Sequence, residues 1–135
     1  YQVNIKKESM FNTPPVFSVY VSMLTLEWLK NLGGVPEIER VNKAKAELLY
    51  NEIDNNPMYR GVVEEDDRSV MNATFVLNDN SKEEEFNQML ADGRINGLKG
   101  HSSVGGYRAS MYNALPLESV QALVDIMQAF AGKNT

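Results

Sequence analysis

The spacing of apolar residues changes along this chain of 135 residues, and that change constrains the fold more than any other feature. Up to about residue 54 the apolar side chains recur at steps of three and four, as on one face of a helix. Residues 58–77 read instead as strands, and helical spacing returns near the C-terminus. The element order ααββαββα predicts an α+β fold, a two-layer sandwich of a small, mostly antiparallel sheet with helices on one face.

Two helices are expected in the first part of the chain. The first should begin at Pro14 or Pro15, because proline fits the first helical turn, and should end at Gly33 and Gly34. Its apolar face, which we expect to be buried, consists of Phe17, Tyr20, Val21, Leu24 and Trp28. The second helix, from about 36 to 54, carries a face made of Ile38, Val41, Lys45, Leu48 and Leu49.

Strands are expected at 58–63 and 69–77, joined by the acidic turn 64–67. Ser81 and Glu84 are spaced as a capping box for a third helix that runs to about Asp92. Two further strands, near 95–99 and 107–112, should enclose a loop, and a terminal helix should follow from Leu117. The acidic turn lacks the ligand spacing and the glycine bend of a calcium loop, so we predict no metal site.

Charge and composition limit the classes of partner. A net charge of -5 and a pI near 4.9 argue against binding to nucleic acid or to an anionic membrane. The absence of cysteine excludes disulfides and thiolate metal sites and fits any compartment. No apolar run approaches the roughly 20 residues of a membrane span, and no leader is recognisable. We therefore expect a soluble, cytoplasmic protein.

The segment KGHSSVGGYRASMYN, residues 99–113, holds the only histidine, His101, between two cations, Lys99 and Arg108. Three glycines at 100, 105 and 106 permit close backbone approach and positive φ angles, which suit a main chain that wraps an anion. An arginine can bind a carboxylate or phosphate through two parallel hydrogen bonds. The alternative is a glycine-containing hairpin with an incidental histidine, and the residues alone favour that alternative.

Asn12 and Thr13 form a second candidate site, directly before the two prolines that open the first helix. Unpaired amides and the partial positive charge of a helix N-terminus suit a phosphate, and these side chains would add neutral donors. The alternative is that one of them simply caps the helix, since both residue types are favoured caps.

Several long motifs resemble the phosphoserine aminotransferase family, which belongs to the class V aminotransferases among the fold type I pyridoxal-phosphate enzymes. The motifs are NTPP before a helix within MFNTPPVFSVYVSMLTLEWLKNLGG, DRSVMNATFVL, and KGH followed by VGGYRAS. Together they cover nearly the whole chain. The resemblance implies that residues 1–135 are the C-terminal small domain of such an enzyme, with residues 1–15 carrying a loop for the cofactor phosphate.

The resemblance also implies roles for individual residues. Asn12 and Thr13 would reach across a homodimer to the phosphate of pyridoxal 5'-phosphate in the neighbouring subunit, so that the active sites are shared. Arg108 would hold the α-carboxylate of the substrate, and His101 would help to bind its phosphate. Ser102 stands where the family usually has arginine, so it brings one hydroxyl donor but neither charge nor fork.

The implied activity is the transfer of an amino group between L-glutamate and 3-phosphohydroxypyruvate, giving O-phospho-L-serine and 2-oxoglutarate in serine biosynthesis. Some members of the family also act in pyridoxine synthesis. No lysine here lies in a context that resembles the family's Schiff-base lysine, so we expect the chain to be part of a longer enzyme and inactive alone. The other hypothesis is a free-standing, non-catalytic module that binds a small phosphorylated or carboxylated metabolite.

Overall fold

The computed structural model describes residues 1–100 and 105–134. These residues form two compact units, Tyr1–Ile38 and Glu39–Thr135. The first unit contains α1 (Gln2–Lys6) and α2 (Val16–Asn31), and α3 (Gly34–Asn55) begins in it. The second unit contains most of α3, the strands that the described residues form, and two further α-helices: α4 (Glu83–Asp92) before the last strand and α5 (Leu117–Asn134) after it.

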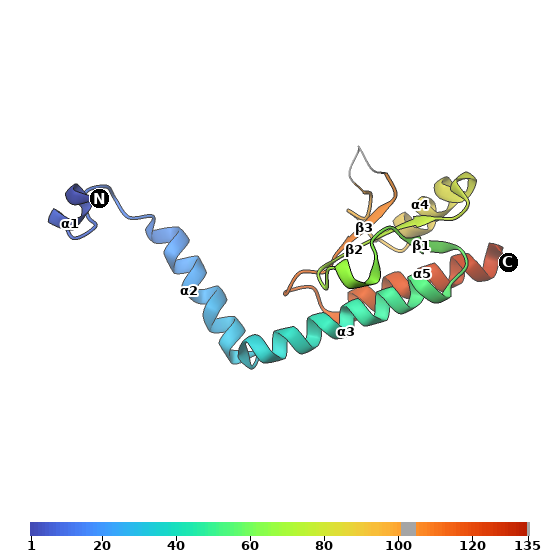
Figure 1. Ribbon diagram of the computed structural model, residues 1–135, viewed down its shortest axis with the longest axis horizontal. Coiled ribbons are helices and arrows are strands. Elements are labelled where there is room, and N and C mark those ends of the chain that lie inside the picture. The colour runs from blue at the N-terminus through green and yellow to red at the C-terminus, as the bar shows by residue number, and fades with distance from the viewer. Residues whose placement is uncertain (101–104, 135) are drawn as a thin grey trace. The chain divides into compact units, whose positions relative to one another are not determined.

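The sheet has three antiparallel strands in the order β1-β2-β3 (Figure 1). These are β1 (Tyr59–Gly61), β2 (Asn72–Leu77) and β3 (Tyr107–Ser110). The register pairs Tyr59 with Leu77 and Phe75 with Tyr107. Two short 3-10 turns lie in the connections, η1 (Glu65–Asp67) and η2 (Asn80–Lys82). The acidic segment is therefore a turn, as predicted.

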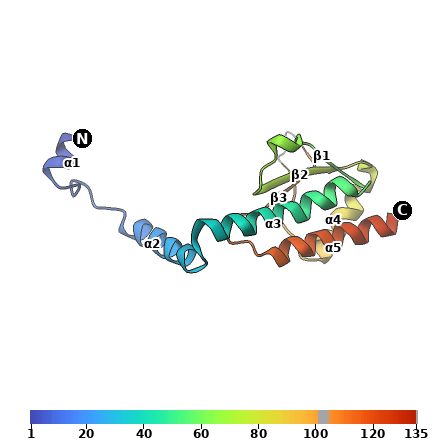
Figure 2. The ribbon, with the colours of Figure 1, turned by 60° about the horizontal axis from the view of Figure 1, so that its bottom comes forward.

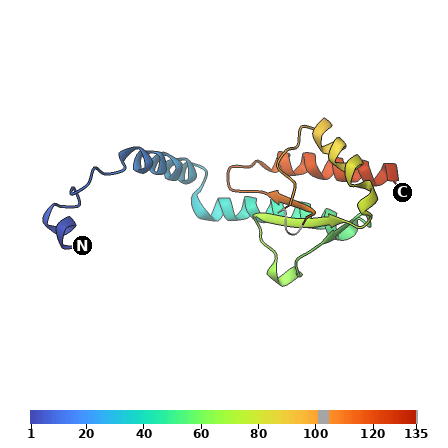
Figure 3. The same ribbon diagram turned by 90° about the horizontal axis from the view of Figure 1, so that it is seen from above.

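The helices of the second unit cover one face of this sheet, which confirms the predicted α+β architecture. Along β2 the buried residues alternate with half-buried ones, and the buried set is Ala73, Phe75 and Leu77. Helices α3 and α5 lie side by side beneath that face (Figure 2). Figure 3 shows α4 beside α5, where Phe86 and Phe130 place their ring centroids 4.9 Å apart. Burial of these aromatic and aliphatic side chains supplies the main stabilisation of the unit.

The fourth predicted strand, near 95–99, is wrong. Within the described residues this stretch makes only an isolated bridge between Lys99 and Tyr107. The physical reason is the backbone: Arg94 and Gly97 have φ angles of 59° and 77°, which interrupt an extended conformation. The other three predicted strands are present but shorter than expected.

The predicted capping box is also wrong. The carboxylate of Asp79 accepts hydrogen bonds from the backbone N–H of Ser81 at 3.0 Å and from its hydroxyl at 2.6 Å. Ser81 thus lies inside η2, and α4 begins two residues later without a side-chain cap. The short side chain of Asp79, two residues upstream, accepts from the Ser81 amide, which a capping box would instead pair with Glu84. Glu83, Glu84 and Glu85 form an acidic first turn of α4, where negative charge interacts favourably with the helix dipole.

The predicted burial of the first helix is wrong as well. Helix α2 has no buried residue, and Phe17 is 79 % exposed. The other residues of its predicted apolar face, Tyr20, Val21, Leu24 and Trp28, are also exposed. A helix needs a second packed layer to bury such a face, and the unit Tyr1–Ile38 offers only α1, which itself has no buried residue. The face predicted for the second helix is correct: Lys45 and Leu49 are both 0 % exposed.

Candidate functional site

Strand β3 presents Arg108 on the face of the sheet opposite the helices. Tyr107 and Ala109 point into the core, so the alternation of the strand leaves Arg108 exposed. The backbone N–H of Arg108 donates to the carbonyl oxygen of Leu98 at 2.6 Å. Within residues 1–100 and 105–134 the Arg108 guanidinium has neither a hydrogen-bond acceptor nor an ion-pair partner. Its donors are therefore available to a planar anion.

The glycines beside Arg108 have the backbone role that the sequence predicted. Gly105 and Gly106 have φ angles of 74° and 64°. The N–H of Gly100 donates to the carbonyl oxygen of Gly106 at 2.8 Å, and a Cβ on Gly100 would collide with the carbonyl oxygen of Gly105. These glycines let the backbone segments before residue 101 and after residue 104 meet closely. His101 and Ser102 themselves lie outside the described residues.

A cavity of about 380 Å³ opens beside Arg108 on this side of the sheet. Its walls are largely apolar, and Arg108 and Thr74 are among the polar exceptions. The remaining lining residues are Val62, Val63, Phe75, Val76, Gly100, Gly105 and Tyr107. An apolar pocket with a few polar groups is the usual setting for a small ligand.

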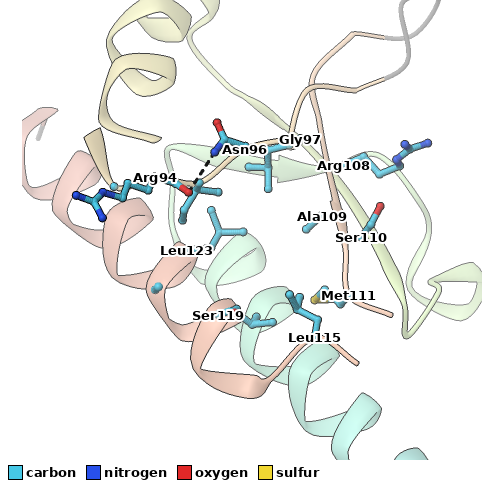
Figure 4. Close-up of a pocket in the computed structure, with 15 residues that line it drawn as sticks. Arg94, Asn96, Gly97, Arg108, Ala109, Ser110, Met111, Leu115, Ser119 and Leu123 are labelled. Carbon is cyan, nitrogen blue, oxygen red and sulfur yellow. Dashed lines mark hydrogen bonds between the residues drawn. The ribbon is translucent and has the colours of Figure 1, made fainter. Parts of the chain in front are cut away.

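A second cavity, also of about 380 Å³, lies between the loop 93–98, β3 and α5 (Figure 4). Ser119 and Leu123 of α5, with Leu115 just before the helix, form one side of it. Arg108 reaches its rim, but the guanidinium points away from Leu123 (Figure 4). The lining of this cavity is mixed, since Arg94, Asn96 and Ser110 lie among apolar residues such as Leu98 and Met111.

Tyr107 is a core residue rather than a ligand. It is 3 % exposed, its ring stacks on Phe75 at a centroid distance of 5.2 Å, and its hydroxyl donates to Asn87 Oδ1 at 3.1 Å. Burial raises the pKa of the Tyr107 phenol to about 12, so the group stays protonated at neutral pH. Tyr107 is therefore a strand residue that packs against its neighbours in the core.

Asn12 and Thr13 do not cap a helix. Helix α2 begins at Val16, its N-cap position is Pro15, and it has no side-chain cap. Both side chains are exposed, and neither has a hydrogen-bond partner among the described residues. The capping alternative is therefore wrong, and the neutral donors of both residues are free for an anionic group such as a phosphate.

Sequence reasoning missed the role of Lys45, although it placed this residue on the apolar face of its helix. The ammonium group is buried and donates to three carbonyl oxygens, at 3.0 Å to Met111, 2.9 Å to Tyr112 and 3.1 Å to Leu115. Burial lowers the pKa of Lys45. The three bonds tie α3 to the segment that leaves β3 only three residues after Arg108. A lysine amid apolar helical spacing was the available signal.

Among residues 1–100 and 105–134, no group of three or more metal-ligating side chains could hold an ion. Within the same residues, no helix is both long and apolar enough to cross a membrane.

Comparison with known proteins assigns the chain to a family. The aminotransferase class-V model matches residues 2–123, so the chain belongs to the class-V aminotransferase family. Over 98 % of its length it is 60 % identical to a phosphoserine aminotransferase of Flavobacterium psychrophilum. It is 54 % identical over 99 % of its length to a phosphoserine aminotransferase of Porphyromonas gingivalis. These matches span 37 % and 38 % of the two relatives.

Solved structures agree with this assignment. The fold superposes on phosphoserine aminotransferase from Bacillus circulans subsp. alkalophilus with a TM-score of 0.89 and 43 % identity, over 100 % of this chain and 38 % of that one. A pyridoxal-phosphate-bound phosphoserine aminotransferase from Trichomonas vaginalis matches with a TM-score of 0.82 and 36 % identity, over 95 % of this chain and 37 % of that one. The chain therefore corresponds to somewhat more than one third of the relatives it matches.

Proposed function

We propose that this chain is the C-terminal small domain of a phosphoserine aminotransferase that transfers an amino group between L-glutamate and 3-phosphohydroxypyruvate. The observation that carries the proposal is Arg108, whose guanidinium has no partner among residues 1–100 and 105–134 and lies on an exposed sheet face beside a cavity of about 380 Å³. Both amino acids and both oxo acids of this reaction carry a carboxylate next to the reacting carbon. A guanidinium fork at this position fits the group that all four share.

Pyridoxal phosphate is the cofactor of the proposed enzyme, and when bound it supplies an electron sink for the reacting carbon. Asn12 and Thr13 fit its phosphate, because their side chains are exposed and offer donors that no described residue uses. We propose that they reach the phosphate in the partner subunit of a homodimer. These neutral donors would hold the phosphate through hydrogen bonds without adding charge.

His101 and Ser102 complete the proposed substrate site. They follow Gly100, which is positioned by Gly106 and lines the cavity beside Arg108. We assign His101 to the substrate phosphate, because imidazole titrates near neutral pH and can donate to a dianion. Ser102 would add one hydroxyl donor. The arginine common at this position in the family would then need a substitute in the rest of the enzyme.

The same proposal makes the protein a cytoplasmic homodimer in serine biosynthesis, with pyridoxine synthesis as a related role. The residues of this chain bind and orient the substrate. The proton at the reacting carbon is assigned to a lysine that this chain does not supply, so the chain alone should not transaminate. A free-standing, non-catalytic module is the second candidate, and it requires the chain to bind a small phosphorylated or carboxylated metabolite without any further domain.

The test is the Arg108→Ala variant of the full-length enzyme, measured in single turnovers with glutamate and with phosphoserine separately. Loss of the shared carboxylate contact should slow both half-reactions by roughly tenfold to a hundredfold at subsaturating substrate. His101→Ala should slow the phosphoserine half-reaction more than the glutamate one. A selective loss with only one substrate in the Arg108 variant would contradict the carboxylate assignment. Absence of transamination in the wild-type enzyme would refute the function itself.

A further inference from the structure

Arg108 has a close polar neighbour on the adjacent strand. Thr74 of β2 is its direct register partner. Because the Arg108 N–H points away from β2 towards Leu98, the two residues form a non-hydrogen-bonded pair. Side chains in such pairs are the closest that antiparallel strands offer, with Cβ atoms about 5 Å apart. Thr74 and Arg108 therefore stand next to each other on the face opposite the helices.

Both side chains line the cavity beside Arg108, where Val62, Val63 and Val76 supply apolar walls. Thr74 is half-buried, and its hydroxyl has no hydrogen-bond partner in the part of the chain that the structure describes. A half-buried hydroxyl between valines and an unpaired guanidinium provides one more donor that a ligand could use.

The next pair along the same face behaves differently. Ser110 lies opposite Asn72, and its hydroxyl donates to Asn72 Oδ1 at 3.2 Å. This pair satisfies its own hydroxyl donor, whereas the Thr74 and Arg108 pair does not. The two adjacent pairs share strands, spacing and face, so the contrast is specific to the position beside the cavity.

We propose that Thr74 is a second ligand of the substrate α-carboxylate and acts together with Arg108. This inference rests on the proposed function. A carboxylate offers about four lone-pair sites, and a guanidinium fork uses two of them. The Thr74 hydroxyl would donate to one of the remaining sites. Thr74 then determines specificity for substrates that carry a carboxylate, and it contributes nothing to recognition of the phosphate end.

The decisive variant is Thr74→Val in the full-length enzyme, because valine keeps the β-branched shape and removes only the hydroxyl. The ligands are O-phosphoserine and O-phosphoethanolamine, which lacks the α-carboxylate. Apparent Kd values come from the dependence of the cofactor absorbance on ligand concentration. Thr74→Val should weaken O-phosphoserine binding about tenfold and leave O-phosphoethanolamine binding unchanged. Thr74→Ser should restore most of the lost affinity.

Ser110→Ala is the matched control, since it removes a hydroxyl from the same face that is already satisfied by Asn72. It should leave both apparent Kd values unchanged. Equal weakening of the two ligands by Thr74→Val, or no weakening of O-phosphoserine, would overturn the role of Thr74 while the proposed function stands. A wild-type enzyme that does not bind O-phosphoserine would refute the proposed function and this inference together.

Discussion

Lys45 is the residue whose environment differs most from that of its type. A buried ammonium group is costly, and this one has no carboxylate beside it in the described residues. Three carbonyl oxygens instead accept its three N–H donors, so every polar hydrogen is used. The three carbonyls come from the turn between β3 and α5. Lys45 thus adds a donor to three carbonyls of this turn, of which Tyr112 also accepts from the backbone N–H of Leu115.

We expect Lys45→Met to destabilise the chain by roughly 2–4 kcal/mol, because methionine matches the stem but removes the ammonium donor from the carbonyls of Met111, Tyr112 and Leu115. Urea unfolding measures the free energy. Hydrogen exchange at the Leu115 amide, which donates to the Tyr112 carbonyl, should speed up as the turn loosens.

The control is Lys43→Met, two residues away on the same helix. The Lys43 side chain is 65 % exposed and forms a surface ion pair with Glu39 at 2.6 Å. Its loss should change the midpoint little. Equal effects of the two variants would mean that desolvation of the Lys45 ammonium cancels its three hydrogen bonds.

At the scale of elements, the chain just before β3 packs closely against the backbone of β2. Gly106 approaches Phe75 so closely that a Cβ would lie 2.8 Å from its carbonyl oxygen and 2.7 Å from Val76 Cγ1. Gly105 has a similar positive φ but open space around its missing Cβ. A comparison of alanine substitutions at the two positions therefore distinguishes the cost of backbone strain, common to both, from the cost of steric collision, which arises only at Gly106.

Gly106→Ala should destabilise the fold by more than about 2 kcal/mol, because strain at positive φ adds to a collision with backbone. Gly105→Ala should cost only the strain, about 1–2 kcal/mol. Thermal unfolding of the two variants gives the comparison. A larger loss in Gly105→Ala would show that the contact between Gly106 and Phe75 relaxes freely.

The sequence predicted elements best where one local signal dominated. Helical spacing located α3 and α5 within about two residues, and β2 was predicted from its alternation. The error at 95–99 came from single residues, since positive φ at Arg94 cannot be read from an arginine. The cap error came from Asp79, whose carboxylate accepts from the Ser81 amide that a capping box would have paired with Glu84.

The site was predictable in part for the same reason. The glycines at 105 and 106 predicted positive φ angles, and the structure confirms them. The exposure of Arg108 follows from strand alternation once Tyr107 is placed in the core. Thr74 and Lys45 could not be assigned, because each depends on a partner more than 30 residues away. The roles of His101 and Ser102 stay predictions.

At the scale of the whole molecule, α2 is the helix whose apolar side chains the described residues leave exposed. Its exposed apolar residues include Val16, Phe17, Val19 and Leu26, which lie around the helix rather than on one stripe. A helix that is apolar on all sides is normally buried in a larger protein. The relatives supply that context, since this chain spans 37 % of the Flavobacterium psychrophilum enzyme. We expect other parts of the proposed enzyme to cover α2.

The last prediction follows from this exposure. The 135-residue chain alone should bind a hydrophobic dye and self-associate at micromolar concentration, because contiguous apolar surface in water is unfavourable. Replacing Phe17 and Leu26 by serine should reduce both effects, since these side chains are 79 % and 64 % exposed. Tyr112→Ser is the control: Tyr112 is 59 % exposed but lies outside α2, so its removal should change neither dye fluorescence nor the sedimentation coefficient. The same two serine substitutions should have a cost in the full-length enzyme. There they should lower the stability, because the two side chains would lose buried contacts. A monomeric, dye-free chain, or a full-length enzyme indifferent to the substitution, would show that α2 needs no cover.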